Sequence, residues 1–225
     1  MSDKYDLLYL DPPWFYNKRN NANTRYGGGA GIHYPLMKTK DICAMPIPDM
    51  MADRCLVFMW GCFPKDAEFH KVLKAWNLTF VSIGLLWVKL NKSGRVIYVP
   101  KNTAIDSHGN FTNKKSIVLD GGTQFGTGFY AKSNAEPCWL ARKGRTYKPC
   151  RNDISNLVFA PHTGVHSEKP AEVRDRISMM YPDLRKAEVF ARHTSSGWDS
   201  YGNEVGKLDG PPRLSLTLSE SEGCR

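Results

Sequence analysis

The chain has 225 residues, of which 41% are hydrophobic and 24% charged, and a formal net charge of +9. This length and apolar content predict one soluble domain with a substantial core, and no run of 18 apolar residues suggests a membrane span. The opening residues MSDKYD lack a signal-peptide pattern, so we expect an intracellular, cytoplasmic protein. The positive charge favours nucleic acid as a partner, with a basic surface that serves only solubility as an equal alternative.

The six cysteines lie far apart, with no C-x-x-C pair and no histidine at zinc-finger spacing. This spacing predicts reduced, packed thiols and no metal site. The six are Cys43, Cys55, Cys62, Cys138, Cys150 and Cys224.

The first element is a short apolar stretch, KYDLLYL, followed by DPPW. The stretch has the length and composition of a buried parallel strand, and Pro12 and Pro13 end it. Asp11 then lies at the C-terminal tip of the strand, at the sheet edge where α/β proteins bind ligands. The stiff backbone of the two prolines would present Trp14 as a flat aromatic face beside the carboxylate. The stretch therefore predicts a site for a planar substrate.

A polar, glycine-rich and basic segment over residues 17–32 follows, which we interpret as a functional or mobile loop. RCLVFMW (54–60) predicts a second buried strand, and LTFVSIGLLWVK (78–89) predicts a third. A helix that begins at Pro64 is predicted between them, because apolar residues recur at i, i+3, i+4 and i+7. Strand, helix and strand with short connections indicate a parallel sheet. The periodic residues are Phe69, Val72, Leu73 and Trp76.

Residues 90–128 break the pattern, with two β-like pieces at 95–99 and 116–119, and we interpret them as an inserted flap or hairpin. The α/β pattern then returns with EPCWLARKG, a strand NLVFA, a helix that begins at Pro170 and a strand KAEVFA that ends at Arg192. The tail, 207–225, has no core pattern and is expected at the surface. We therefore predict one domain over 1–206, followed by this tail.

Parallel strands would bring three segments to one edge of the sheet. These are Asp11, the loop 161–168 that leads to Lys169, and residues 192–203. A carboxylate, an ammonium, a guanidinium and an Asn-Glu pair suit a zwitterionic cofactor that carries a ribose. The alternative is that each of these residues is an ordinary surface charge.

Several motifs occur in the order seen in the MT-A70 family of adenine-N6 methyltransferases, which the chain resembles over about residues 4–206. After DPPW the motifs are HYPLM, LVFMWG, LLWVKLN, EPCWLARKG, HSEKPAE and EVFARHTSSGWDSYGNE. The resemblance implies a Rossmann-like α/β fold, with a mostly parallel sheet and helices on both faces, and S-adenosylmethionine as the cofactor. It also implies methyl transfer to the N6 amine of adenine in DNA, on a flipped or single-stranded base.

The resemblance also implies roles for single residues. The catalytic motif is Asp11, Pro12, Pro13 and Trp14, with Trp14 stacking on the base. Cofactor contacts are implied for Asp11, Lys169, Glu188, Val189, Arg192, Asn203 and Glu204. Positions around the acceptor adenine are Trp14, Tyr34, Trp60, Trp87, Lys89 and Glu136. Apart from the resemblance, the charge of the two basic loops predicts phosphate contacts for Lys18, Arg19, Arg25, Lys114 and Lys115, with a role in solubility alone as an equal alternative.

The sequence departs from the family in two places. Only ten residues precede Asp11, so an upstream aspartate that caps the cofactor adenine in many members has almost no room, and Asp6 or another contact must serve. HTSSGWDS, after Arg192, differs from members with a His-Asn pair. Three alternatives stay open: an RNA adenine-N6 methyltransferase, a catalytically silent nucleic-acid-binding subunit, and a nucleotide-binding module unrelated to methylation. A homodimer is also left open.

Overall fold

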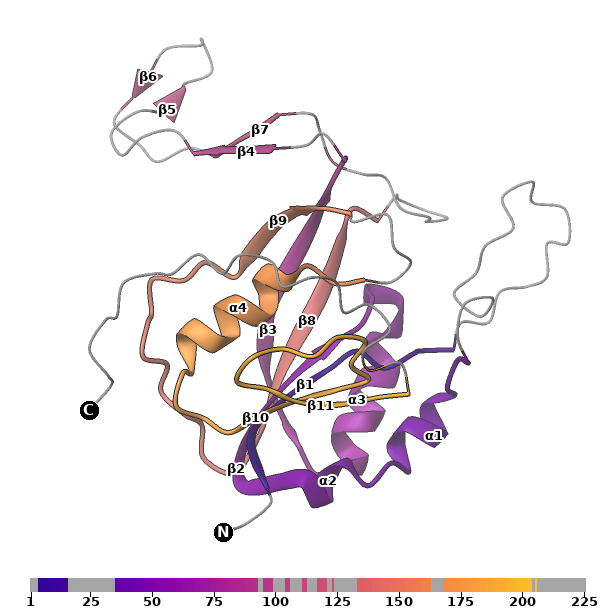
Figure 1. Ribbon diagram of the computed structural model, residues 1–225. Helices are drawn as coiled ribbons and strands as arrows, with labels where there is room; N and C mark the ends of the chain where they lie inside the picture. The colour runs from indigo at the N-terminus through magenta and orange to yellow at the C-terminus, as the bar shows by residue number, and fades with distance from the viewer. Residues whose placement is uncertain are drawn as a thin grey trace, which may run out of the picture.

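The computed structural model describes residues 4–15, 35–92, 95–98, 104–105, 111–112, 117–120, 123, 133–162, 168–203 and 205. Within these residues the core is a seven-stranded sheet with the strand order β11-β10-β1-β2-β8-β3-β9 (Figure 1). The strands are β1 (Tyr5–Leu10), β2 (Met51–Trp60), β3 (Thr79–Leu90), β8 (Ala135–Lys143), β9 (Leu157–Pro161), β10 (Lys186–Val189) and β11 (Asp199–Tyr201).

The sheet is mostly parallel, as predicted, but β8 runs antiparallel to both of its neighbours, β2 and β3. The pairs β1–β2, β1–β10, β10–β11 and β3–β9 are parallel. The predicted strand-helix-strand unit is confirmed, because β2 and β3 run in the same direction with β8 inserted between them. Because β8 runs in the opposite direction, its first residues, including Glu136, lie at the end of the sheet where the parallel strands finish.

Helices cover both faces of the sheet (Figure 1). Leu8 and Leu10 of β1 pack in one core cluster with α1 (Thr39–Cys43), α2 (Ile47–Met50) and α3 (Asp66–Ala75), whereas Leu7 and Tyr9 pack in a second cluster with α4 (Ala171–Met180). This alternation follows from the two-residue period of a strand, which sends successive side chains to opposite faces. The predicted Rossmann-like α/β architecture is therefore confirmed.

The two long helices begin where the prolines indicated. Pro64 lies in a 3-10 turn (Phe63–Lys65) that leads into α3, and Pro170 is the N-cap residue of α4. The predicted apolar side of α3 is buried at all four positions. Burial of an aliphatic or aromatic side chain of this size stabilises a fold by about 1.5–3 kcal/mol, so packing on the sheet fixes α3.

The insertion contains the expected hairpin. β4 (Arg95–Tyr98) pairs antiparallel with β7 (Ile117–Asp120), and between them in the chain β5 (Ala104–Ile105) pairs with β6 (Phe111–Thr112). In Figure 1 these strands lie beyond the ends of β3 and β9. The loop 17–32 and the tail 207–225 fall outside the described residues, so the predictions for them stay predictions.

The strand predicted at 186–191 is shorter in the structure. β10 ends at Val189 because the next residue, Phe190, has a φ of 66°, a left-handed conformation that a strand cannot continue through. Cys43, Cys55, Cys62 and Cys138 are free thiols. In the described part of the chain, no helix is long and apolar enough to cross a membrane. The same residues contain no group of three or more His, Cys, Asp or Glu that could hold a metal ion.

Candidate active site

Asp11 lies directly after the C-terminal end of β1, which is an interior strand of the sheet. Its backbone N–H donates to the Val189 carbonyl at the end of β10, over 3.4 Å. Its Oδ2 accepts a hydrogen bond from Nζ of Lys169 over 2.9 Å, across 158 residues of sequence. The structure therefore brings together Asp11 and Lys169, the two charged groups that the predicted parallel sheet placed at one edge.

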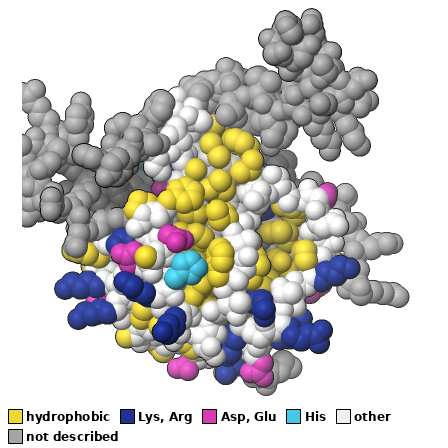
Figure 2. All heavy atoms as spheres, turned by 180° about the vertical axis from the view of Figure 1, so that it is seen from behind, with side chains coloured by type: hydrophobic (Ala, Val, Ile, Leu, Met, Phe, Trp, Pro, Cys, Tyr) yellow, Lys and Arg dark blue, Asp and Glu magenta, His cyan; other side chains and the backbone are white. Residues whose placement is uncertain are grey.

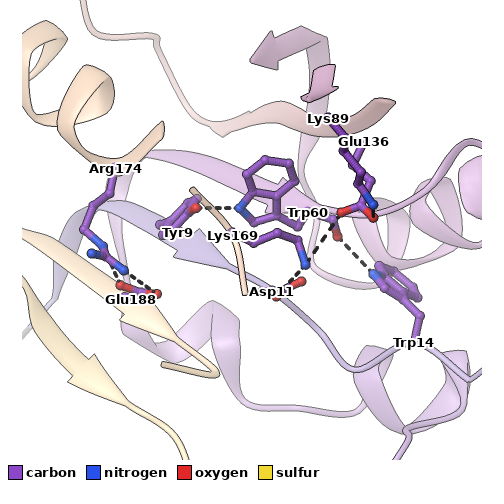
Figure 3. Close-up of polar contacts among 9 residues, drawn as sticks. All are labelled: Tyr9, Asp11, Trp14, Trp60, Lys89, Glu136, Lys169, Arg174 and Glu188. Carbon is purple, nitrogen blue, oxygen red and sulfur yellow. Dashed lines mark hydrogen bonds and ion pairs between the residues drawn. The ribbon is translucent and has the colours of Figure 1, made fainter. Parts of the chain in front are cut away.

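The Asp11–Lys169 pair continues into a chain of four alternating charges (Figure 3). Nζ of Lys169 lies 3.8 Å from Oε2 of Glu136, and the other oxygen of Glu136 accepts a short hydrogen bond from Lys89. All four side chains are between 13% and 29% exposed, so each is packed among protein atoms but reachable from solvent. Lys169 is thus held between two carboxylates, and Asp11 lies at one end of this row of four charges.

The surroundings shift the two carboxyl groups in opposite directions. Burial and the nearby Glu136 raise the pKa of Asp11, and this outweighs Lys169 and Arg192, which lower it. Burial also raises the pKa of Glu136, but Lys169 and Lys89 together outweigh it, and the pKa of Glu136 lies below its ordinary value. Glu136 is therefore the more firmly ionised partner, and Asp11 is the carboxylate whose charge is least compensated.

Two tryptophans lie beneath the ammonium groups. Nζ of Lys169 lies 5.5 Å from the ring centroid of Trp60, and Nζ of Lys89 lies 5.0 Å from that of Trp87. The Trp60 indole donates to the Tyr9 hydroxyl over 2.5 Å, and the Trp87 indole donates to the Ala160 carbonyl over 2.9 Å. Both rings are almost fully buried. They hold the cations by cation–π attraction and form the base of the site.

The structure corrects the expectation that Trp14 offers a free face to a base. Trp14 is only 4% exposed, and its indole nitrogen donates to the Trp60 carbonyl over 3.0 Å. The backbone after Pro13 also pairs with Met37, which locks the ring inward. A buried indole needs a hydrogen-bond acceptor, and the end of β2 supplies it. Trp14 therefore positions the DPPW segment, and stacking on it is excluded in this conformation.

The segment after β10 is shaped by backbone strain. Phe190 is a bulky residue at positive φ, an arrangement that costs energy and is concentrated at functional sites. Beyond it, the Ala191 N–H donates to the Tyr201 carbonyl, and a Cβ added to Gly202 would lie 2.5 Å from the Ala191 carbonyl oxygen. Only glycine permits this approach. Ala191 and Gly202 are therefore in backbone contact, and Arg192 and Asn203 are the residues that follow them. Arg192 is close enough to Asp11 to lower its pKa.

In Figure 3, the Glu188 side chain lies apart from Asp11 and pairs with Arg174 of α4. Nε and Nη2 of Arg174 donate to its two carboxylate oxygens over 2.8 and 3.2 Å. Because the Glu188 carboxylate is already bound by Arg174, a cofactor contact at this position would have to come from the Glu188 backbone. Sequence reasoning missed Arg174. A glutamate inside the apolar run KAEVFA was the available signal, because a buried charge requires a partner.

Several predicted site residues lie outside the described residues, and their roles stay predictions. They are Lys18, Arg19, Arg25, Tyr34, Lys114, Lys115 and Glu204.

Comparison with protein families matches residues 5–110 and 109–204 to the MT-A70 family. Among curated proteins, the type II methyltransferase M.MunI of Mycoplasma sp is 27% identical over 90% of this chain and 78% of its own length. The human N(6)-adenine-specific methyltransferase METTL4 is 27% identical over 91% of this chain, and the N6-methyladenosine RNA methyltransferase MTA1 of Pyricularia oryzae is 28% identical over 98%. The chain spans only 38% and 52% of these last two proteins.

The order of motifs, the α/β sheet and the match over nearly the whole chain agree with one another. The chain belongs to the MT-A70 family of S-adenosylmethionine-dependent adenine-N6 methyltransferases.

Proposed function

We propose that the protein transfers a methyl group from S-adenosylmethionine to the N6 amine of adenine in DNA. The observation that carries the proposal is the Asp11–Lys169 pair at the tip of β1, where an incompletely compensated carboxylate directly precedes the Pro12 carbonyl. Both oxygens are hydrogen-bond acceptors, and an exocyclic amine has two N–H groups to donate.

The residues fit the proposed cofactor. Its amino-acid part carries an ammonium and a carboxylate, and Asp11 and Lys169 offer the complementary charges side by side. Arg192 and Asn203, brought close by the contact at Gly202, would face its ribose and base. When bound, S-adenosylmethionine supplies an activated methyl group on a sulfonium, so the protein has only to orient the acceptor.

The chain's own contribution is to hold the amine and its charge. The Asp11 carboxylate and the Pro12 carbonyl would accept the two N–H groups, which draws the nitrogen lone pair out of the ring and toward the methyl donor. The Pro12 carbonyl already accepts the Trp14 N–H over 2.8 Å, and its second lone pair is available. Positive charge that develops on the nitrogen is stabilised by both acceptors. Orientation supplies most of the rate. No strong general base is needed, because the methylated nitrogen is acidic and readily loses its proton to Asp11 or to water.

DNA is favoured as the substrate by the likeness to M.MunI, which covers most of both chains. An adenine inside a duplex cannot reach Asp11, so the base would be flipped at a cost of a few kcal/mol. RNA is the second candidate, favoured by the likeness to the RNA methyltransferase MTA1.

The test is transfer of a radiolabelled methyl group from S-adenosylmethionine to double-stranded DNA, single-stranded DNA and RNA of matched sequence, with Asp11→Asn as the control. Labelled N6-methyladenine in DNA is the expected product. Label in RNA alone would replace DNA by RNA as the substrate. Cofactor binding without transfer to any polymer would contradict the proposed activity and indicate a catalytically silent subunit.

A further inference from the structure

The end of the sheet opposite Asp11, where β1 and β2 begin, carries a group of four cations. β8 is antiparallel, so it ends where β1 and β2 begin, and its last residues lie beside the start of β2. Arg54 precedes Trp60 by six residues on one strand, which places the group about 20 Å from the candidate active site. We call the group the distal basic surface: Arg54, Arg142, Arg145 and Lys148.

The turn after β8, which carries Arg145 and Lys148, has a defined conformation. Gly144 has a φ of 63°, and a Cβ there would lie 2.3 Å from the Asp53 carbonyl oxygen, so the turn is packed on the start of β2. The Arg54 guanidinium lies 4.1 Å from the Tyr147 ring centroid and donates to the Thr146 carbonyl over 3.0 Å. The Tyr147 hydroxyl in turn donates to Asp6 over 2.6 Å. Aromatic stacking and carbonyl contacts, rather than ion pairs, hold Arg54 in place.

Among the residues that the structure describes, the cations of this surface form no ion pair. Among the described residues, no carboxylate lies within 4.0 Å of the charged nitrogens of its four members. Arg151, Arg174 and Arg176, by contrast, each contact a carboxylate. Cys55 pairs with Lys143 and Leu56 with Arg142, so Arg54 lies next to the last paired residue of β2, beside the end of β8.

Figure 2 shows Lys and Arg side chains around the lower margin of the molecule, with Asp and Glu side chains among them. Adjacent like charges destabilise each other unless an anion lies between them. Guanidinium groups that are already oriented, with donors to spare, suit phosphate oxygens, which they bind through two parallel hydrogen bonds. Clustered cations without ion pairs, together with an oriented guanidinium group, favour binding of a polyanion at this surface.

We propose that the distal basic surface binds the phosphate backbone of the nucleic-acid substrate, outside the segment that enters the active site. This inference rests on the proposed function, which already places a polyanion at the opposite edge of the sheet. A nucleic acid that contacts both edges must span at least about 20 Å around the protein. Binding should therefore depend on substrate length.

The test uses fluorescence anisotropy with two labelled ligands, a 60-base-pair duplex and a tetranucleotide, which is too short at about 14 Å to span both edges. The test variant is Arg54→Gln, Arg145→Gln and Lys148→Gln. A control variant of equal charge change is Lys40→Gln, Lys71→Gln and Lys74→Gln, at exposed positions of α1 and α3. Melting temperature and cofactor affinity report the integrity of the fold, and the double variant Arg145→Gln/Lys148→Gln leaves the Tyr147 stack untouched.

For the duplex, we expect the test variant to lose at least tenfold in affinity, and the slope of log K against log salt to fall by about 2.7, or 0.9 for each cation. The tetranucleotide should bind all proteins alike. Equal losses in the test and control variants, or an unchanged salt slope, would overturn the inference. So would loss of binding to phosphatidylserine vesicles with duplex binding intact, which would assign the surface to a membrane.

The two proposals fail separately. Absence of cofactor binding and methyl transfer, with the salt slope still reduced in the test variant, refutes the proposed function and leaves a nucleic-acid-binding surface. Normal methyl transfer with an unchanged salt slope refutes only the distal surface. A wild-type protein that binds neither ligand overturns both.

Discussion

Replacing Asp11 by asparagine should separate activity from stability. The amide keeps the size of the side chain but removes its charge. Burial and Glu136 raise the pKa of Asp11 more than Lys169 and Arg192 lower it, so the ionised carboxylate is less favourable in the folded chain than in the unfolded one. At neutral pH the charge of Asp11 therefore subtracts from stability, and a neutral side chain removes that cost. We expect the melting temperature of Asp11→Asn to equal or exceed that of the wild type.

Activity should respond in the opposite direction. Loss of one fixed acceptor for charge that develops in the transition state costs about 10²–10³ in rate, or about 2.7–4 kcal/mol. Loss of a hydrogen bond to a charged group costs a further 1.5–3 kcal/mol, about 10- to 100-fold, if Asp11 also contacts the cofactor ammonium. Single-turnover methyl transfer and differential scanning calorimetry on the same preparation measure the two effects.

A variant that melts several degrees lower would show that Asp11 is a stabilising charge and would contradict this prediction. Transfer within tenfold of the wild type would remove Asp11 from the reaction. The pH dependence adds a check on the sign: the destabilisation should be absent below the ordinary pKa of 3.8 and should develop as the pH rises through the raised value.

Three further changes test the supports of the site. Trp14→Phe leaves the Trp60 carbonyl without its donor and should lower the free energy of unfolding in urea by about 1–3 kcal/mol; an unchanged midpoint would make the hydrogen bond irrelevant. Gly202→Ala should cost about 1–3 kcal/mol and weaken cofactor binding, because its methyl group meets the Ala191 carbonyl, and a variant with full affinity would contradict this. Glu136, whose pKa is lowered, stabilises the fold above pH 4.5 and loses this effect as the pH falls through its folded value. Glu136→Gln should therefore lose less stability than the wild type between pH 6 and pH 3, and parallel curves would argue against the charge chain.

The strong periodic segments of the fold were predictable from sequence. β1, β2, α3, β3 and α4 each carry a pattern long enough to indicate the element, and packing agrees with it. The short helices α1 and α2 have five and four residues, which is too few to show a period, and β11 has three. The direction of β8 was not predictable, because its apolar run is equally suited to a parallel or an antiparallel place.

The site was predictable as a location more than as a set of contacts. Strand ends placed Asp11 and Lys169 at one edge because parallel strands share it. The burial of Trp14 was not predictable, since it depends on the Trp60 carbonyl, 46 residues away in the chain. The contact of Lys169 with Glu136 depends on β8 running antiparallel to its neighbours. The local sequence of β8 does not indicate this direction.

Lys169 and Asp11 are proposed to form the cofactor site. Isothermal titration calorimetry with S-adenosylmethionine, on the wild type, Lys169→Met and the exposed control Lys71→Met, tests it most directly. Loss of one charge-assisted hydrogen bond should weaken binding about 10- to 100-fold in Lys169→Met and leave the control unchanged. Equal affinity of all three folded proteins would contradict the claim and place the cofactor elsewhere.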